Sequence, residues 1–138
     1  MDPATVTVSF PVPPAVAYDY LLEPANRPRW QRTLRDVEAP LGPRRAGLRW
    51  RDVTRLPGVR PHLRLVEADR PRRWVEVGTW GGVTGRLALD LEPADEGCSV
   101  TATFAVTGWG AGPLLTRLGV REVRADLHRA ARDLAGPA

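Results

Sequence analysis

Two segments at opposite ends of the chain constrain its fold more than any other feature of the sequence. Residues 5–10 alternate threonine or serine with valine or phenylalanine, as a half-buried β-strand does. Residues 113–134 place apolar side chains along one side of a single long helix. Several strand-like segments lie between them, without a second long helical pattern. A sheet that must bury one face therefore has one apolar helix to wrap, and this arrangement often leaves a cavity between the layers.

The segments between these ends predict a short helix, a further helical turn and six more strands. The helix is expected at 12–22, the turn at 24–29, and the strands at 32–38, 46–55, 60–68, 73–80, 83–92 and 98–107. Prolines and glycines fall between the strands, and the short connections favour antiparallel hairpins. We therefore predict one α+β domain over residues 1–138, with a curved antiparallel sheet of about seven strands around the C-terminal helix.

The terminal helix carries an apolar stripe beside a basic flank. The stripe comprises Thr116, Val120, Val123, Leu127, Ala130, Ala131 and Leu134, and the flank Arg117, Arg121, Arg124, His128 and Arg132. Leu114, Leu115 and Leu118 do not share this stripe. They could line the mouth of a pocket or cap the core, and we favour the core.

Composition excludes several classes of protein. The single cysteine, Cys98, leaves neither an internal disulfide nor a site made of several cysteines. The two histidines lie in different contexts, which disfavours a metal site. We find no apolar run of the ~18 residues that a membrane span needs and no signal-peptide pattern at the N-terminus. These observations predict a cytoplasmic protein without a cofactor, and they leave its oligomeric state open.

The net charge of +4 is unevenly distributed along the chain. All 20 basic residues are arginine, and residues 44–73 hold ten of them against three acids, a local balance of +7. Such a segment could attract anionic ligands or polyanions. It is more often the solvated face of a meander, which we favour here.

The order of the motifs resembles the SRPBCC superfamily, most closely its polyketide cyclase/dehydrase-like branch. The resemblance rests on residues 8–21, with their proline-rich turn and the pair Tyr18-Asp19, and on 24–30, which end at Trp30. Later parts of the chain are also similar to that family. These are residues 66–73, Leu91-Glu92-Pro93 with the following Gly97, and the closing helix.

This resemblance implies a helix-grip fold, as in START lipid-transfer domains and the birch-pollen allergen, with a cavity that binds small hydrophobic molecules. The branch takes its name from aromatase/cyclases that fold polyketide chains, in which tryptophans and an arginine on a middle strand orient the chain. Trp30 matches the early tryptophan. Leu65 stands near the position of the arginine, and Arg64 lies in the opposite phase of the strand, so the chain departs from the cyclase pattern.

Large apolar side chains at strand ends, on inward strand faces and on the helix are the candidates for ligand contact. The predicted set is Trp30, Trp50, Leu65, Trp80, Leu89, Phe104, Trp109, Leu118 and Val123. The same residue types also fill cores, and we expect about half of the tryptophans to do only that.

Glu76 is the candidate catalytic residue, although the phase of its strand is open. If Trp74 and Trp80 face inward, Glu76 faces inward with them, and a desolvated carboxylate there could act as a base. If Val75 and Val77 face inward, Glu76 is a surface acid, which is the commoner outcome and the one we favour.

Three functions remain open from the sequence. The first is binding of a small hydrophobic ligand, aromatic or acidic, in the cavity. The second is a cyclase, aromatase or dehydratase of secondary metabolism that uses Glu76 or a tyrosine. The third is a nucleic-acid or protein-interaction domain built on residues 44–73, which lacks a recognised binding motif and is disfavoured.

Overall fold

The computed structural model describes residues 3–38, 42–108, 110 and 112–136. The elements are β1 (Ala4–Phe10), α1 (Pro14–Leu22), the 3-10 turn η1 (Pro24–Asn26), α2 (Arg27–Trp30), β2 (Leu34–Glu38), β3 (Arg49–Thr54), β4 (His62–Asp69), β5 (Arg73–Trp80), β6 (Val83–Ala94), β7 (Gly97–Thr107) and α3 (Gly112–Leu134). The predicted α+β helix-grip architecture, with seven strands and a long C-terminal helix, is confirmed.

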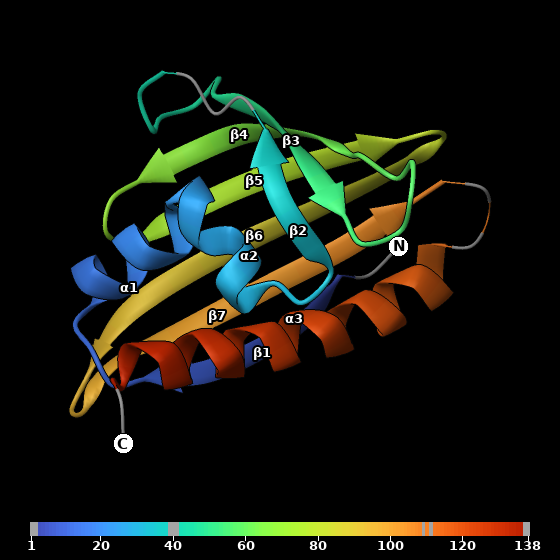
Figure 1. Ribbon diagram of the computed structural model, residues 1–138. Coiled ribbons are helices and arrows are strands. Elements are labelled where there is room, and N and C mark those ends of the chain that lie inside the picture. Colours follow the sequence, from blue (N-terminus) through green and yellow to red (C-terminus); the bar gives the residue numbers. More distant parts are fainter. Residues whose placement is uncertain (1–2, 39–41, 109, 111, 137–138) are drawn as a thin grey trace.

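The strands form one antiparallel sheet in the order β1-β7-β6-β5-β4-β3-β2. The first strand pairs with the last, and the other neighbours are joined through successive hairpin-like connections. The helix α3 lies along β1 and β7, and α1 and α2 cover the same face of the sheet (Figure 1). One face of the sheet is therefore the face that the helices cover.

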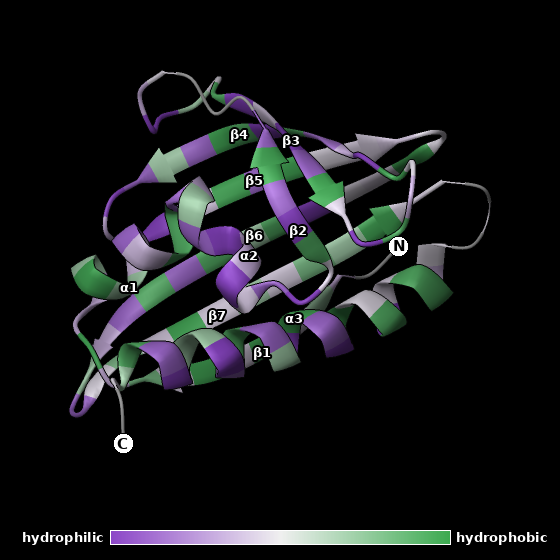
Figure 2. Cartoon of the chain, viewed as in Figure 1, coloured by the Kyte–Doolittle hydropathy of each residue, from purple (hydrophilic) through white to green (hydrophobic). Residues whose placement is uncertain are grey.

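Alternating side chains explain why these segments become strands with one buried face. In β1, Val6, Val8 and Phe10 are buried, whereas Thr5 and Thr7 are exposed. Bands of hydrophobic and hydrophilic residues alternate along the strands in the same way (Figure 2). This period of two fixes the register, because a slip by one residue would move every apolar side chain to the opposite face.

The apolar stripe of α3 is confirmed. Leu127 and Ala130 are buried, and Val120 and Val123 pack against the core. Thr116 anchors the helix to β7, because its hydroxyl accepts a hydrogen bond from the backbone N–H of Val106 at 2.9 Å. None of the described helices is long and apolar enough to cross a membrane.

We favoured a core position for the leucines in the first turns of α3, and this prediction is wrong for two of them. Leu114 is 58% exposed and Leu118 is 48% exposed. Both fall outside the stripe that faces the sheet, so their side chains have no buried surface to contact.

Helix α3 lies close to a side chain of the sheet at Gly119. A Cβ atom at this position would overlap the ring of Phe104, which projects from β7. The missing side chain therefore lets a large aromatic ring pack directly beneath the helix. Because both residues also line the cavity described below, this contact helps to set the cavity's shape.

We predict that Gly119→Ala destabilises the protein by about 1–3 kcal/mol, because the new methyl group overpacks against Phe104. Alanine for glycine inside a helix is otherwise favourable by about 1 kcal/mol. In a Phe104→Ala background, where the methyl group has room, the same substitution should therefore raise stability. Urea unfolding of the four variants measures both effects. An equal stabilisation in both backgrounds would show that the close approach is absent.

Candidate functional site

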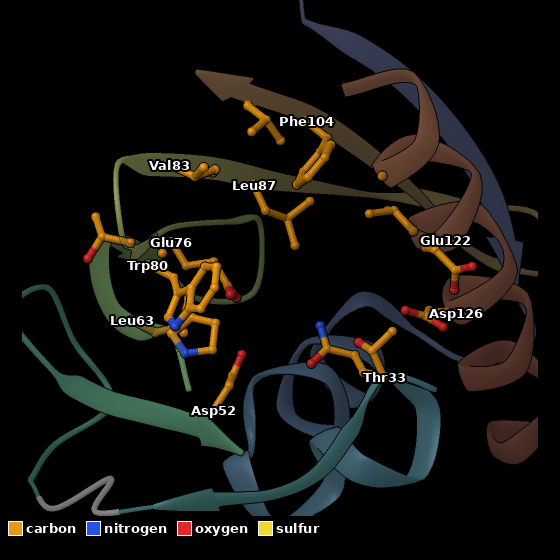
Figure 3. Close-up of a pocket in the computed structure, with 18 of the residues that line it drawn as sticks. Thr33, Asp52, Leu63, Glu76, Trp80, Val83, Leu87, Phe104, Glu122 and Asp126 are labelled. Carbon is orange, nitrogen blue, oxygen red and sulfur yellow. The ribbon is translucent and has the colours of Figure 1, made fainter. Parts of the chain in front are cut away.

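A cavity of about 320 Å³ lies between the sheet and α3. Its lining comprises Arg27, Gln31, Thr33, Asp52, Pro61, Leu63, Glu76, Gly78, Thr79, Trp80, Val83, Gly85, Leu87, Phe104, Val106, Gly119, Glu122, Val123 and Asp126. Figure 3 shows Val83, Leu87 and Phe104 on one side of this space, and the carboxylates of Asp52, Glu122 and Asp126 around the other. The cavity thus has an apolar wall and an acidic end.

Two glycines on neighbouring strands help to leave this space open. Gly78 of β5 is paired directly with Gly85 of β6, and both line the cavity. On the same face, the positions beside this pair carry Leu63 and Val106. Because the central pair lacks side chains, the middle of the inward face stays low while the flanking residues form walls.

The acidic end is organised by a buried ion pair between α2 and β5. Arg27 is 2% exposed, and its two terminal nitrogens donate to the two carboxylate oxygens of Glu76 at 2.8 and 2.9 Å. The Nε–H of Arg27 donates to Gln31 at 3.0 Å. Burial alone would lower the pKa of Arg27, but the charge and hydrogen bonds of Glu76 outweigh it and raise that pKa above its ordinary value. The guanidinium of Arg27 is therefore protonated, and the carboxylate of Glu76 balances its positive charge.

Three tryptophans surround this guanidinium. The Arg27 Cζ atom lies 5.3 Å from the ring centre of Trp30, 5.8 Å from that of Trp50 and 6.0 Å from that of Trp74. These distances are within the range of cation–π attraction, which is stronger away from water. The rings also exclude water from the ion pair. This pair joins α2 to β5 and so fixes α2 over the sheet.

A second carboxylate, Asp52 of β3, lies at the same end of the cavity. Asp52 is 9% exposed, and its Oδ1 atom accepts a hydrogen bond from the indole N–H of Trp50 at 3.1 Å. Desolvation raises the pKa of Asp52 to about 6, with a further increase from Glu76, against the lowering effects of Arg27 and the Trp50 hydrogen bond. This carboxyl group can therefore exchange a proton near neutral pH.

Helix α3 supplies two more acids, Asp126 and Glu122. The Oδ1 atom of Asp126 accepts hydrogen bonds from the backbone N–H of Arg32 at 3.2 Å and from Arg129 at 3.0 Å. Desolvation is the largest influence and raises the pKa of Asp126 in spite of these bonds. Within the described residues, acids, histidines and cysteines form no group of three or more that could hold a metal ion. The carboxylates thus surround the space rather than converge on one ion.

The structure places four of the predicted site residues in the cavity lining, namely Glu76, Trp80, Phe104 and Val123. Trp30 and Trp50 instead contact Arg27, and Leu65 and Leu89 are buried in the core, outside this lining. Leu118 is half-exposed on α3 and also lies outside the lining. Trp109 lies outside the described residues.

The favoured surface position of Glu76 is wrong, since this residue is 4% exposed. The alternation along β5 did not identify the inward face, because Val75 is fully buried as well as Glu76. Both faces of the strand are covered at this point. The inward phase carries Trp74 and Glu76, and the Trp74 indole N–H donates to the Glu76 carboxylate at 3.0 Å. Both oxygens of Glu76 already accept hydrogen bonds, which makes it a poor base.

Sequence reasoning missed Arg27 and Asp52 and left Asp126 without a role. A usable signal was a repeated spacing: Trp50 precedes Asp52, and Trp74 precedes Glu76, by two residues on strands. Residues two apart share a face of a strand, and in both cases the indole donates to the acid that follows. This spacing marks an inward carboxylate beside an aromatic ring.

The sequence allowed a tyrosine as the catalytic group, and both tyrosines of the chain, Tyr18 and Tyr20, lie outside the cavity lining. Tyr18 packs edge-on against Trp74 with ring centres 5.6 Å apart, and Tyr20 donates to Asp133 at 2.8 Å. Burial is the main cause that raises the pKa of each to about 12. Such groups stay protonated at neutral pH, which disfavours either as a base.

Part of the basic segment at 44–73 lies on the outer face of the sheet. Arg49 and Arg64 are exposed and directly opposite each other, while Trp50 and Leu63 beside them point inward. A solvated outer face agrees with the interpretation favoured from the sequence. Binding of nucleic acid by this face stays a prediction.

The family model described as "Polyketide cyclase / dehydrase and lipid transport" matches residues 1–135. The chain belongs to this family. No curated protein sequence matches it significantly.

Solved structures with the same fold cover nearly the whole chain. Ara h 8.0201 has a TM-score of 0.80 at 12% identity, and the match covers 98% of each chain. Protein NE0264 from Nitrosomonas europaea has a TM-score of 0.77 at 15% identity, over 97% of this chain and 94% of that one. DynU16, a protein of the dynemicin biosynthetic locus, has a TM-score of 0.76 at 17% identity, over 99% of this chain and 48% of that one. At these identities the likeness establishes the fold alone.

We predict that Arg27→Met destabilises the protein by about 3–5 kcal/mol, because Glu76 is left charged and buried without its partner. Adding Glu76→Gln removes that charge and keeps an acceptor for Trp74, so the double variant should recover much of the loss. Chemical unfolding measures the four stabilities. Arg29→Met, at an exposed position of the same helix, serves as the control and should change stability by less than about 0.5 kcal/mol. Additive losses in the double variant would contradict a coupled pair.

Proposed function

We propose that this protein binds a small hydrophobic molecule in the cavity between the sheet and α3. The observation that carries the proposal is the apolar wall that Leu63, Val83, Leu87, Phe104 and Val106 form on one side of the cavity. Ligand sites are typically concave and mostly apolar with a few polar groups that fix orientation. Membership of a family described by lipid transport and polyketide chemistry supports the same function.

The size of the space supports a compact ligand. Its volume of about 320 Å³ lies at the lower end of the range of roughly 300–1,000 Å³ found for small-molecule sites. Trp80 lines the cavity and is 42% exposed, so its ring lies where the cavity meets solvent. A flat aromatic ligand could contact this ring as it enters.

We predict that Val123→Trp weakens binding of the neutral fluorescent probe N-phenyl-1-naphthylamine by about tenfold or more, because the indole occupies the cavity from α3. The wild-type protein should bind the probe saturably with one site per chain. Leu118→Trp places the same side chain on the same helix outside the lining, so it should leave the affinity unchanged. Fluorescence titration measures all three. Absence of saturable binding to the wild type, or an equal effect of both variants, would refute the proposal.

A second candidate function is acid–base catalysis, and Asp52 is the observation that favours it. A catalytic acid or base works best when its pKa lies near the operating pH, and that of Asp52 is raised to about 6. Dehydration of a β-hydroxy ketone needs a base for the proton on the carbon beside the carbonyl, and it needs an acid for the departing hydroxyl. Asp52 and Asp126 are carboxyl groups of one cavity with raised pKa values, which suits this division of roles.

A phenyl-substituted β-hydroxy ketone tests this second function, because its dehydration to the conjugated enone changes ultraviolet absorbance. The wild type should accelerate the reaction, and Asp52→Asn should remove most of the acceleration while probe binding persists. An uncatalysed rate with the wild-type protein would argue against the enzyme and leave the binding proposal intact.

A further inference from the structure

The charge of the cavity lining restricts the ligand further. Within the described residues, Arg27 is the one cation in the lining, and four acids accompany it. Both terminal nitrogens of Arg27 are bound to Glu76, so this guanidinium is not available to an anionic ligand. Asp126 has Arg129 at 3.0 Å, whereas Asp52 and Glu122 have no ion pair among the described residues. The lining therefore carries an excess of negative charge.

Asp52 is the acid of the lining that is best placed to accept a hydrogen bond from a ligand. Its side chain is about nine-tenths buried, and its carboxylate points into the cavity (Figure 3). Its Oδ1 atom is bound by Trp50, and no described residue donates a hydrogen bond to its Oδ2 atom. This oxygen is therefore free to accept a hydrogen bond from a charged donor on a ligand. The free acceptor and the apolar cavity wall beside it are separate observations that point to one ligand.

We propose that the ligand is an organic cation, a protonated amine attached to a compact apolar or aromatic body, with the ammonium group bound by Asp52 at the acidic end of the cavity. This inference rests on the proposed function and narrows its ligand class. The apolar body occupies the wall of Leu87 and Phe104, and the ammonium group faces Asp52 with the charges of Glu122 and Asp126 across the space. Hydrogen bonds between charged partners are shorter and stronger than neutral ones.

The same lining disfavours the acidic ligand considered from the sequence. A carboxylate ligand would meet Asp52, Glu122 and Asp126, while Arg27, the one cation of the lining among the described residues, is already paired with Glu76. Like charges close together repel, and more strongly beside a buried group such as Asp52 than in bulk water. None of the basic residues at 44–73 that suggested an acidic ligand lines this cavity.

The test compares three ligands that share one apolar body: naphthylmethylamine, naphthylmethanol and naphthoic acid. We expect the amine to bind about tenfold or more tightly than the alcohol, and the acid to bind most weakly. In Asp52→Asn the advantage of the amine over the alcohol should disappear, while the affinity for the alcohol stays within about threefold. Glu92→Gln removes the same charge at an exposed position of β6 outside the lining, so it should preserve the advantage. Isothermal titration calorimetry measures each affinity.

The affinity for the amine should also fall as the pH is lowered through about 6, because protonated Asp52 no longer attracts a cation. The other charged groups that line the cavity with Asp52 are Arg27 of α2, Glu76 of β5, and Glu122 and Asp126 of α3. The affinity for naphthylmethanol should change much less over this range. In Asp52→Asn the fall near pH 6 should be lost.

The outcomes separate the two proposals. Equal affinity for the amine and the alcohol, with both weakened by Val123→Trp, would refute the proposal that the ligand is a cation. The proposal of hydrophobic binding would stand. An amine advantage that survives Asp52→Asn would also overturn the assignment. If none of the three ligands binds while N-phenyl-1-naphthylamine still binds saturably, the proposed amine ligand is overturned and hydrophobic binding stands; if that probe fails to bind as well, both proposals fail.

Discussion

The buried pair of Arg27 and Glu76 is the interaction on which the site depends. It joins α2 to β5 across the inward face of the sheet, with both partners nearly inaccessible to water. Taking two charges out of water is costly, and the cost is offset here by a two-pronged hydrogen-bond geometry and by three aromatic rings around the guanidinium. The pair therefore fixes α2, and with it one end of the cavity, in a single arrangement.

The same pair also determines the charge that a ligand meets. Because Glu76 neutralises Arg27, the remaining acids of the lining are not balanced by a cation from within the cavity. Burial raises the pKa of Asp52 to about 6 and also raises that of Asp126. An apolar wall would hold many molecules equally well. In the proposed function the carboxylates supply the selectivity, and in its catalytic alternative they transfer the protons.

The architecture could be predicted because it depends on periodicity. Alternation in 5–10 and in the last two strands marks one buried face, and the stripe from Thr116 to Leu134 marks the helix that covers it. The site could be predicted less fully than the architecture, because it depends on residues whose types are common elsewhere in the chain. Arg27 is one of 20 arginines, and nothing in its local sequence distinguishes it from the exposed Arg29. The phase of β5 was ambiguous because Val75 and Glu76 are both buried.

Desolvation of Asp52 at the acidic end of the cavity is tested most directly by the titration of this carboxyl group. Carbon-13 NMR of the aspartate carboxyl groups gives the pH at the midpoint of the Asp52 titration. The Asp52 signal is assigned by its loss in Asp52→Asn. The account predicts a midpoint at about 6. A midpoint near 3.8, the ordinary value for aspartate, would show that water reaches this carboxylate freely and would contradict the account.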